Sequence, residues 1–220
     1  MRKIIIRSIL MLVAFTIMLS CQKEELQPVS GIVTDPDGEE YAFKSMNDGR
    51  IWLLENLNYG IKGYKSTWYD YDPANAEIYG RLYNFDAAKA ACEALGNGWQ
   101  LPTNEEWAAL AYAYGGYGYH YGTSWGSEYG EHGDAKAANK ALRKNGSSGF
   151  SALLGGMYAG GQYFCLNETG FYWSSTGTGR TANSVFVYKF RSGDRPLIRG
   201  IGRMNEWYSC RCVRDRDGEI

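Results

Sequence analysis

Gly98-Trp99-Gln100-Leu101-Pro102-Thr103-Asn104-Glu105-Glu106-Trp107 is the stretch around which the chain is organised. Its spacing Thr103-x-x-Glu106 is that of a capping box, in which each of the two side chains accepts a hydrogen bond from the other residue's backbone amide. A helix is therefore expected over residues 105–113, entered from a loop that ends at Pro102. Four apolar side chains around the cap predict a cluster for other segments to pack against: Trp99, Leu101, Trp107 and Leu110. The motif determines folding and carries no chemistry of its own.

Hydrophobic spacing predicts two further helices. Over residues 84–95 four apolar side chains fall on one helical face: Phe85, Ala88, Cys92 and Leu95. Asn84 is placed as the N-cap of this helix, and Gly96 is placed to end it. A short third helix is expected over residues 134–144, which are rich in alanine and lysine.

Short strands are expected on both sides of the helices. Before them the ranges are 31–34, 41–43 and 50–57, and after them 150–153, 171–176, 183–190 and 210–213. The order of strands, helices and strands predicts an α+β domain. Asp35 and Asp37 belong to the first turn rather than to a calcium loop, because an EF-hand needs further acidic positions and a glutamate at its twelfth place.

The first 20 residues predict a lipoprotein export signal. A basic start at Arg2, Lys3 and Arg7 precedes an uncharged apolar run that is too short to span a bilayer, which needs roughly 20 residues. Met18-Leu19-Ser20-Cys21 resembles a bacterial lipobox, so we expect lipidation at Cys21 and an outer-membrane anchor. Gln22-Lys23-Glu24-Glu25 resembles the short acidic signal that sends lipoproteins of Bacteroidota to the cell surface. An ordinary charged tether is the alternative.

Processing would leave a tether over residues 21–30, one domain over residues 31–215 and a tail over residues 216–220. It removes three of the 23 basic residues and none of the 24 acidic ones, so the mature chain carries a net charge of −4. The sequence shows no basic stripe, which excludes nucleic acid as the expected partner. The same net charge disfavours a polyanionic ligand.

Four cysteines remain once Cys21 is assigned to lipid: Cys92, Cys165, Cys210 and Cys212. An even number in an oxidising compartment favours disulfides. The alternative is a zinc site, for which Cys210-x-Cys212 without a second nearby pair is a weak signal.

Residues 112–130 form the most unusual segment, because tyrosines alternate there with glycines and serines. The segment is long for a connection inside a compact domain, and its β-forming residues have no clear partner. We therefore expect a surface loop that faces a ligand, with Trp125 and some of Tyr114, Tyr117, Tyr119 and Tyr121 exposed. Tyrosine gives a large contact area at low entropic cost, which suits binding loops. The alternative is that these tyrosines pack onto the domain and onto one another.

Seven motifs occur in an order that is typical of one family. They are Thr34-Asp35-x-Asp37-Gly38-x-x-Tyr41, Trp52-x-x-Glu55-Asn56-Leu57, Tyr79-Gly80-Arg81-Leu82-Tyr83-Asn84, Gly98-Trp99-x-Leu101-Pro102-Thr103-x-x-Glu106-Trp107, Gly149-Phe150-Ser151-Ala152-Leu153, Tyr172-Trp173-Ser174-Ser175-Thr176 and Arg211-Cys212-Val213. Together they resemble the Fibrobacter succinogenes major paralogous domain, a family of uncharacterised function, from about Ile32 to Asp215.

The resemblance implies a C-type-lectin-like fold, with a small twisted, mostly antiparallel sheet flanked by two main helices and with adjacent N- and C-terminal strands. It implies a disulfide between Cys92 and Cys212, which leaves Cys165 and Cys210 as the second pair. The chain departs from the commoner pattern in two places: Cys92 lies farther from the Gly-Trp-x-Leu-Pro motif, and residues 112–130 look like an insertion. The tripeptides of calcium-dependent lectins (Glu-Pro-Asn or Gln-Pro-Asp, and Trp-Asn-Asp) are absent. Calcium-dependent sugar binding is therefore not expected, and neither is a cofactor.

Three classes of function remain open. The first is a surface binding module for a neutral glycan or a protein, and the second is a structural or assembly component of a surface structure. The third is an enzyme, because residues 210–215 resemble the end of formylglycine-generating enzymes, whose two reactive cysteines are spaced more widely. Two thiols on one face of a strand could bind copper(I). A hydrolase using His120 or His132, and a metal site in the loop at Glu128, Glu131, His132 and Asp134, are weaker interpretations. No catalytic residue is expected.

Overall fold

The computed structural model describes residues 27–123 and 126–216, without the side chains of residues 122–128. The export signal over residues 1–20, the lipidation site Cys21, Trp125 and residues 217–220 lie outside the described residues. None of the described helices is long and apolar enough to cross a membrane.

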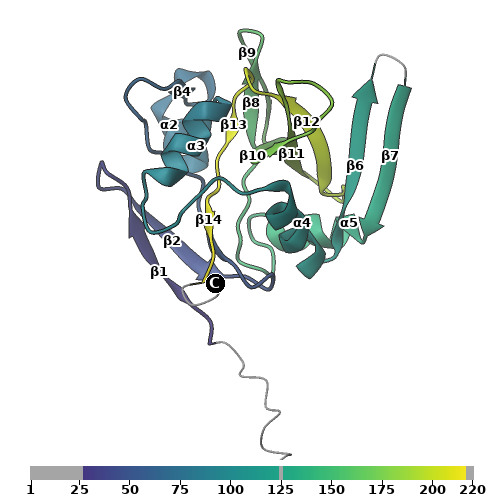
Figure 1. Cartoon of the computed structure of the whole chain (residues 1–220), viewed down its shortest axis with the longest axis horizontal. Helices are drawn as coiled ribbons and strands as arrows, with labels where there is room; N and C mark the ends of the chain where they lie inside the picture. The colour runs from purple at the N-terminus through teal and green to yellow at the C-terminus, as the bar shows by residue number, and fades with distance from the viewer. Residues whose placement is uncertain (1–26, 124–125, 217–220) are drawn as a thin grey trace, which may run out of the picture.

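The smaller of two β-sheets joins the two ends of the domain. In spatial order it contains β1 (Ser30–Thr34), β2 (Glu40–Ser45), β3 (Ile51–Leu53) and β14 (Val213–Arg214). β3 pairs antiparallel with β14, so the first and last parts of the domain lie side by side (Figure 1). The strand expected over residues 50–57 is shorter than predicted.

The larger sheet runs across the whole molecule. In spatial order it contains β4 (Ser66–Thr67), β5 (Leu82–Tyr83), β13 (Tyr208–Ser209), β10 (Thr169–Gly177), β11 (Ser184–Arg191), β12 (Ile198–Arg203), β6 (Gly116–Thr123) and β7 (Gly126–Gly133). A hairpin of β8 (Gly155–Ala159) and β9 (Gln162–Leu166) joins it where β8 pairs with β10. Most of the pairings are antiparallel, which gives a mixed α+β fold.

The end of the chain differs from the single strand expected over residues 210–213. Residues 210–212 lie between β13 and β14 and carry the chain from the larger sheet to the smaller one. Their carbonyls are still paired: Leu57 N donates to Cys210 O at 3.0 Å, and Leu53 N donates to Cys212 O at 3.1 Å. The segment that connects the two sheets is therefore hydrogen-bonded to β3 and to the residues that follow β3.

Four α-helices occur in the described part of the chain: α2 (Pro73–Tyr79), α3 (Phe85–Glu93), α4 (Asn104–Ala113) and α5 (Ala135–Leu142). The last three confirm the predicted helices. α2 was not expected, and a 3-10 turn, η1 (Tyr69–Tyr71), precedes it. Its start has a local cause, since Asp72 caps the helix by accepting a bond from Ala74 N at 2.9 Å and Pro73 occupies the first turn.

The capping box of α4 is present with both of its hydrogen bonds. Thr103 Oγ1 accepts from Glu106 N at 3.1 Å, and Glu106 Oε2 accepts from Thr103 N at 2.7 Å. The helix then places Trp107 in the core, where its Nε1 donates to Trp173 O at 3.0 Å and its ring stacks on Tyr188 at 5.3 Å. The motif thus works as a folding element, as predicted.

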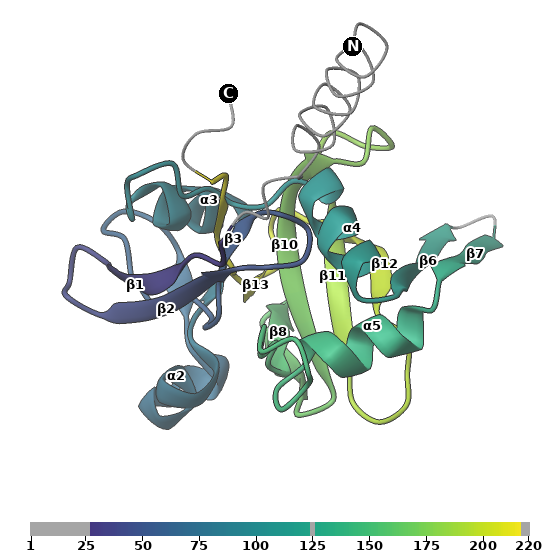
Figure 2. The same cartoon turned by 90° about the horizontal axis from the view of Figure 1, so that it is seen from below.

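Two apolar cores lie on opposite faces of the central strands. Tyr172 of β10 pairs with Tyr188 of β11, and both pack with Trp107 beneath α4 and α5 (Figure 2). Their neighbours Trp173 and Val187 point to the other face, where they belong to the core that includes α3. Successive strand residues alternate between faces, so one pair of strands serves both cores.

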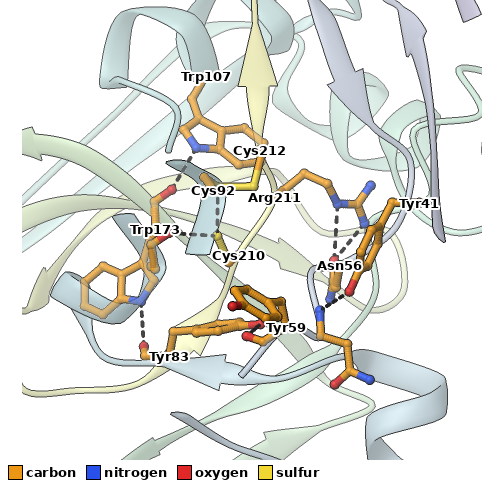
Figure 3. Close-up of a disulfide and its surroundings, with 12 residues drawn as sticks. Tyr41, Asn56, Tyr59, Tyr83, Cys92, Trp107, Trp173, Cys210, Arg211 and Cys212 are labelled. Atoms are coloured by element: carbon orange, nitrogen blue, oxygen red, sulfur yellow. Dashed lines mark hydrogen bonds between the residues drawn. A yellow bond between two sulfur atoms is a disulfide. The ribbon is translucent and has the colours of Figure 1, made fainter. Parts of the chain in front are cut away.

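Arg211 is fully buried and joins three of the sequence motifs (Figure 3). Its Nη1 donates to Phe150 O at 2.6 Å and Leu53 O at 3.2 Å, and its Nη2 donates to Asn56 Oδ1 at 2.7 Å. The guanidinium also lies 4.6 Å from the centroid of the Phe150 ring. Burial lowers the pKa of Arg211, and its polar contacts offset the loss of water.

The segment over residues 112–130 is not a loop, so that expectation is wrong. Its first residues end α4, and the rest enters the hairpin β6–β7, whose register runs from Gly116 opposite Gly133 to Thr123 opposite Gly126. The missing partner strand is residues 126–133, which carry few apolar side chains and therefore gave no strand signal. β7 is an edge strand of the larger sheet (Figure 1).

Candidate functional site

One face of the larger sheet becomes open where the core ends. Along this face of β10 and β11 the paired residues are Trp173 with Val187, then Phe171 with Lys189, then Thr169 with Arg191. The first pair is buried in the core, whereas Lys189 and Arg191 are only half-buried. The face therefore changes from apolar to basic within one strand.

The same face continues across the hairpin. Ile198 of β12 pairs with Lys189 on one side and with Gly118 of β6 on the other. In the hairpin, Gly118 pairs with Glu131, and His120 pairs with Tyr129. Directly paired residues point to the same side of a sheet. Five strands thus contribute side chains to a single surface, although those strands are far apart in the sequence.

Two glycines keep the floor of this surface low. A Cβ at Gly200 would lie 2.7 Å from Lys189 Cε, and a Cβ at Gly118 would lie 2.9 Å from Ile198 Cδ1. Either contact is closer than real Cβ atoms allow, so a side chain there would displace its neighbour. Because Gly200 has none, the Lys189 side chain can lie across it.

The result is a cleft of about 550 Å³ between the hairpin and the sheet. Its lining residues are Tyr119, His120, Tyr129, Gly130, Glu131, Thr169, Phe171, Lys189, Arg191, Pro196 and Ile198. His120 and Tyr129 form an exposed stacked pair, with ring centroids 4.4 Å apart and an angle of 8° between the planes. Tyr129 leaves 67% of its surface exposed, which provides an aromatic face for a ligand ring.

Lys189 and Arg191 provide the charge of the cleft. Within the described residues, neither Lys189 Nζ nor the Arg191 guanidinium has a hydrogen-bond or ion-pair partner. Lys189 Nζ lies 5.5 Å from the centroid of the Phe171 ring. Burial lowers the pKa of Lys189, and the charge of Glu206 only partly opposes this. A desolvated cation without an acceptor marks a position where a ligand acceptor would be stabilising.

A second cleft, of about 620 Å³, lies beside the first and shares His120 and Lys189 with it. The other residues that line it are Arg180, Thr181, Ser184, Ile201, Arg203 and Glu206. The two clefts together, called the hairpin groove below, carry four basic side chains (Arg180, Lys189, Arg191 and Arg203) against two acidic ones (Glu131 and Glu206).

The tyrosines that the sequence assigned to a ligand surface are distributed differently. Tyr119 borders the hairpin groove, but its ring stacks on the ring of Tyr121, with the centroids 5.3 Å apart. Tyr117 and Tyr121 are buried, at 4% and 6% exposure. Tyr117 packs in the core that includes α4, and Tyr121 accepts a bond from Arg199 Nε at 2.7 Å. Tyr114 is half-buried against the same core, and Trp125 lies outside the described residues. The alternation of β6 explains this outcome, since its tyrosines point to the face opposite His120.

Sequence reasoning missed Phe171, Lys189 and Arg191. The signal was present in β11, where Val185, Val187, Lys189 and Arg191 occupy one face and change from apolar to basic. What the sequence could not provide was the pairing of that strand end with the hairpin.

The disulfide between Cys92 and Cys212 is present, with its Cα atoms 5.6 Å apart, and it joins α3 to the end of the chain. The second expected pair is wrong, because Cys165 and Cys210 are both free thiols. Cys210 is fully buried with its Sγ 3.3 Å from Cys92 Sγ (Figure 3). Cys165 is partly exposed on β9. Burial raises the pKa of Cys210, so its thiol is neutral and enclosed rather than arranged as a nucleophile.

The sequence offered two candidate metal sites, one at the cysteines and one in the segment over residues 128–134. Among the residues that the structure describes, only Cys92, Cys210 and Cys212 bring three possible ligand atoms within 4.8 Å of one another, and two of these form the disulfide. In the second candidate, the loop residues Glu128, Glu131, His132 and Asp134, one carboxylate has another role: Asp134 caps α5 by accepting from Ala137 N at 2.9 Å. His132 packs on the Tyr117 ring at 5.1 Å, and the side chain of Glu128 lies outside the described residues.

The family model of the Fibrobacter succinogenes major domain matches residues 46–214, most of the chain. No curated protein and no solved structure matches the chain.

Proposed function

The chain belongs to the Fibrobacter succinogenes major domain family, and we propose that it is a binding module whose ligand site is the hairpin groove. The observation that carries this proposal is the open end of the sheet face, where an exposed aromatic pair stands beside Lys189 and Arg191, whose charged groups have no hydrogen-bond or ion-pair partner among the described residues. Ligand sites combine an apolar or aromatic wall with a few convergent polar groups, and the groove has both. A glycan is the ligand that best suits an exposed stacked ring pair on a rigid sheet.

The proposal is tested on a glycan array with two matched tyrosine variants. Tyr129→Ala removes an exposed ring from the groove, and Tyr64→Ala removes an exposed ring outside it. We expect Tyr129→Ala to weaken glycan binding about tenfold, the size of an aromatic contact of about 1.4 kcal/mol. Tyr64→Ala should bind as the unaltered protein does. Equal binding by all three proteins would place the ligand elsewhere.

We also infer that the fold is a C-type-lectin-like one. Two observations support this: the antiparallel pairing of β3 with β14 and the disulfide that joins α3 to the end of the chain. An experimental structure whose central strands connected in a different order would contradict the inference.

We further propose that the module binds without catalysing a reaction. The support is the state of the sulfur atoms, since Cys212 is in a disulfide and Cys210 is enclosed. Copper(I) titration against the number of accessible thiols tests this proposal. Stoichiometric copper binding by the native protein would favour the enzyme interpretation.

For the location of the protein, we propose a lipid anchor at Cys21 and display on the cell surface. The support lies in the sequence, in the lipobox-like Met18-Leu19-Ser20-Cys21 and the acidic residues that follow it. Cys21→Ala should give an unprocessed or soluble product. Protease added to intact cells should degrade the native protein, and full protection would contradict surface display while leaving lipidation possible.

A further inference from the structure

The local charge of the hairpin groove has the opposite sign to the charge of the chain. The net charge of −4 after processing led to the expectation of a neutral ligand. That charge is spread over the whole surface, and screening limits exposed charges to about 8 Å at physiological ionic strength. Within the groove, four basic side chains face two acidic ones. At contact distance the local excess decides which ligand is attracted.

Lys189 is positioned to present its charge rather than to stabilise the fold. Its side chain lies across Gly200, which holds the ammonium group over the Phe171 ring. Among the described residues that line the groove, the only carboxylates are those of Glu131 and Glu206, and no ion pair joins Lys189 to either. Glu206 instead accepts bonds from Arg203 N and from Tyr208 OH.

Arg191 repeats the arrangement two residues farther along the same strand. Positions 189 and 191 share a face of β11, so the guanidinium and the ammonium groups line the same cleft. The backbone of Arg191 is fixed by Asn139, whose Oδ1 accepts from Arg191 N at 3.1 Å and whose Nδ2 donates to Arg191 O at 2.8 Å. These bonds fix where the side chain starts, and its planar guanidinium can pair with a planar carboxylate through two parallel hydrogen bonds.

Given that the groove is the ligand site, as proposed above, we infer that its ligand is an acidic glycan whose sugar rings carry carboxylates. A ring would lie against Tyr129 and His120, and its carboxylate would meet Lys189 and Arg191. The aromatic pair has no role for a bare anion, and the two cations have no role for a neutral sugar. The neighbouring cleft shares His120 and Lys189 and offers space for the next ring of a polymer.

Three probes that differ in one group test the ligand class by calorimetry on the purified protein. They are oligomers of galacturonic acid, the same oligomers as methyl esters, and the same oligomers with the carboxyl group reduced to an alcohol. We expect the acid to bind about 10- to 100-fold more tightly than the other two, the range for a hydrogen bond to a charged group. Inorganic sulfate at the same concentration should not displace it.

Matched variants test whether the preference for the acid comes from Lys189 and Arg191. Lys189→Met and Arg191→Met should each remove most of the preference for the acid and leave the weak affinity for the ester unchanged. Lys89→Met is the control, because Lys89 is also an ammonium over a phenyl ring, at 6.0 Å from Phe85, but lies on α3 outside the groove. It should behave as the unaltered protein does.

The outcomes separate this inference from the proposed function. Equal binding of acid, ester and alcohol that is lost in Tyr129→Ala would overturn the acidic-glycan inference and keep the binding module. Displacement by sulfate would overturn it in favour of a simple anion site. Absence of binding by all three probes, together with an array that shows no glycan, would overturn both.

Discussion

Arg211 and Lys189 both hold a positive charge away from water, and they do so in opposite ways. Arg211 donates to Phe150 O, Leu53 O and Asn56 Oδ1, all within the domain. Lys189 has no such acceptor among the described residues. A group that completes its bonds internally serves the fold, and a group that does not is available to a ligand. The sequence motifs of the family therefore mark the core, and the proposed ligand site lies outside them.

Removing the disulfide is expected to lower the unfolding free energy more than any other change in the core. Cys92→Ala opens a loop with a sequence separation of 120, and we expect a loss of about 4–5 kcal/mol of unfolding free energy. Cys212→Ala should retain most of that stability, because Cys210 Sγ lies 3.3 Å from Cys92 Sγ and can close a loop of nearly the same length. Urea denaturation measures both variants, and peptide mapping without reduction identifies the new bond. If Cys212→Ala is as unstable as Cys92→Ala, Cys210 is not a substitute partner.

Arg211→Met tests whether the buried cation is structural. Removing the guanidinium leaves buried carbonyls without a donor, each at a cost of roughly 1–3 kcal/mol, so we expect a loss of about 3 kcal/mol overall. Arg191→Met removes an arginine side chain without a described partner and should change stability by less than about 0.5 kcal/mol. If chemical denaturation showed equal losses of stability for Arg211→Met and Arg191→Met, the distinction between the core and the groove would be contradicted.

The same contrast holds for two tyrosines of one hairpin. Tyr121→Ala should lower the unfolding free energy by about 3 kcal/mol, because the ring is 6% exposed and its hydroxyl is bonded to Arg199. Tyr129→Ala should cost less than about 0.5 kcal/mol, because that ring is 67% exposed. Thermal denaturation of the two variants measures both losses of unfolding free energy. A large loss in Tyr129→Ala would make that ring part of the core.

Lys189→Met is expected to have a small effect on stability, in the stabilising direction. The folded-state pKa of Lys189 lies below its ordinary value of 10.5, so the unfolded chain binds more protons between the two values and stability rises with pH there. Below that window the unaltered protein carries the full cost of the desolvated charge. Lys189→Met should therefore be more stable than the unaltered protein at pH 7, by less than about 1 kcal/mol. This advantage should shrink toward about pH 10.5, measured by urea denaturation at both pH values. An advantage that grows with pH would contradict the burial of the charge.

The features predicted correctly from the sequence are those that neighbouring residues determine. The capping box, the N-cap at Asn84 and the helix before Lys144 all follow from residues within a few positions of one another. The Cys92–Cys212 pair came from a family resemblance, and its companion failed because elimination does not establish proximity. α2 was missed although Asp72 and Pro73 signal its start.

The groove was beyond prediction for a different reason. Its walls are the end of β11 and the hairpin, which are joined through the pairing of Ile198 with Gly118. That pairing is parallel and short, and a glycine leaves no pattern of side chains to detect. The hydrophobic pattern of β6 indicated correctly that tyrosines alternate, but it could not indicate which face the domain would cover.

The glycine floor of the groove has a consequence for how the site can diversify. Its depth depends on side chains that are absent at Gly118 and Gly200. A glycine codon is a single nucleotide change from alanine, serine, valine, aspartate or arginine. Among paralogous copies, each such change would raise the floor or displace Lys189 while leaving Arg211, the disulfide and the capping box untouched. The proposed ligand surface can therefore be altered by mutation while the contacts that hold the core stay in place.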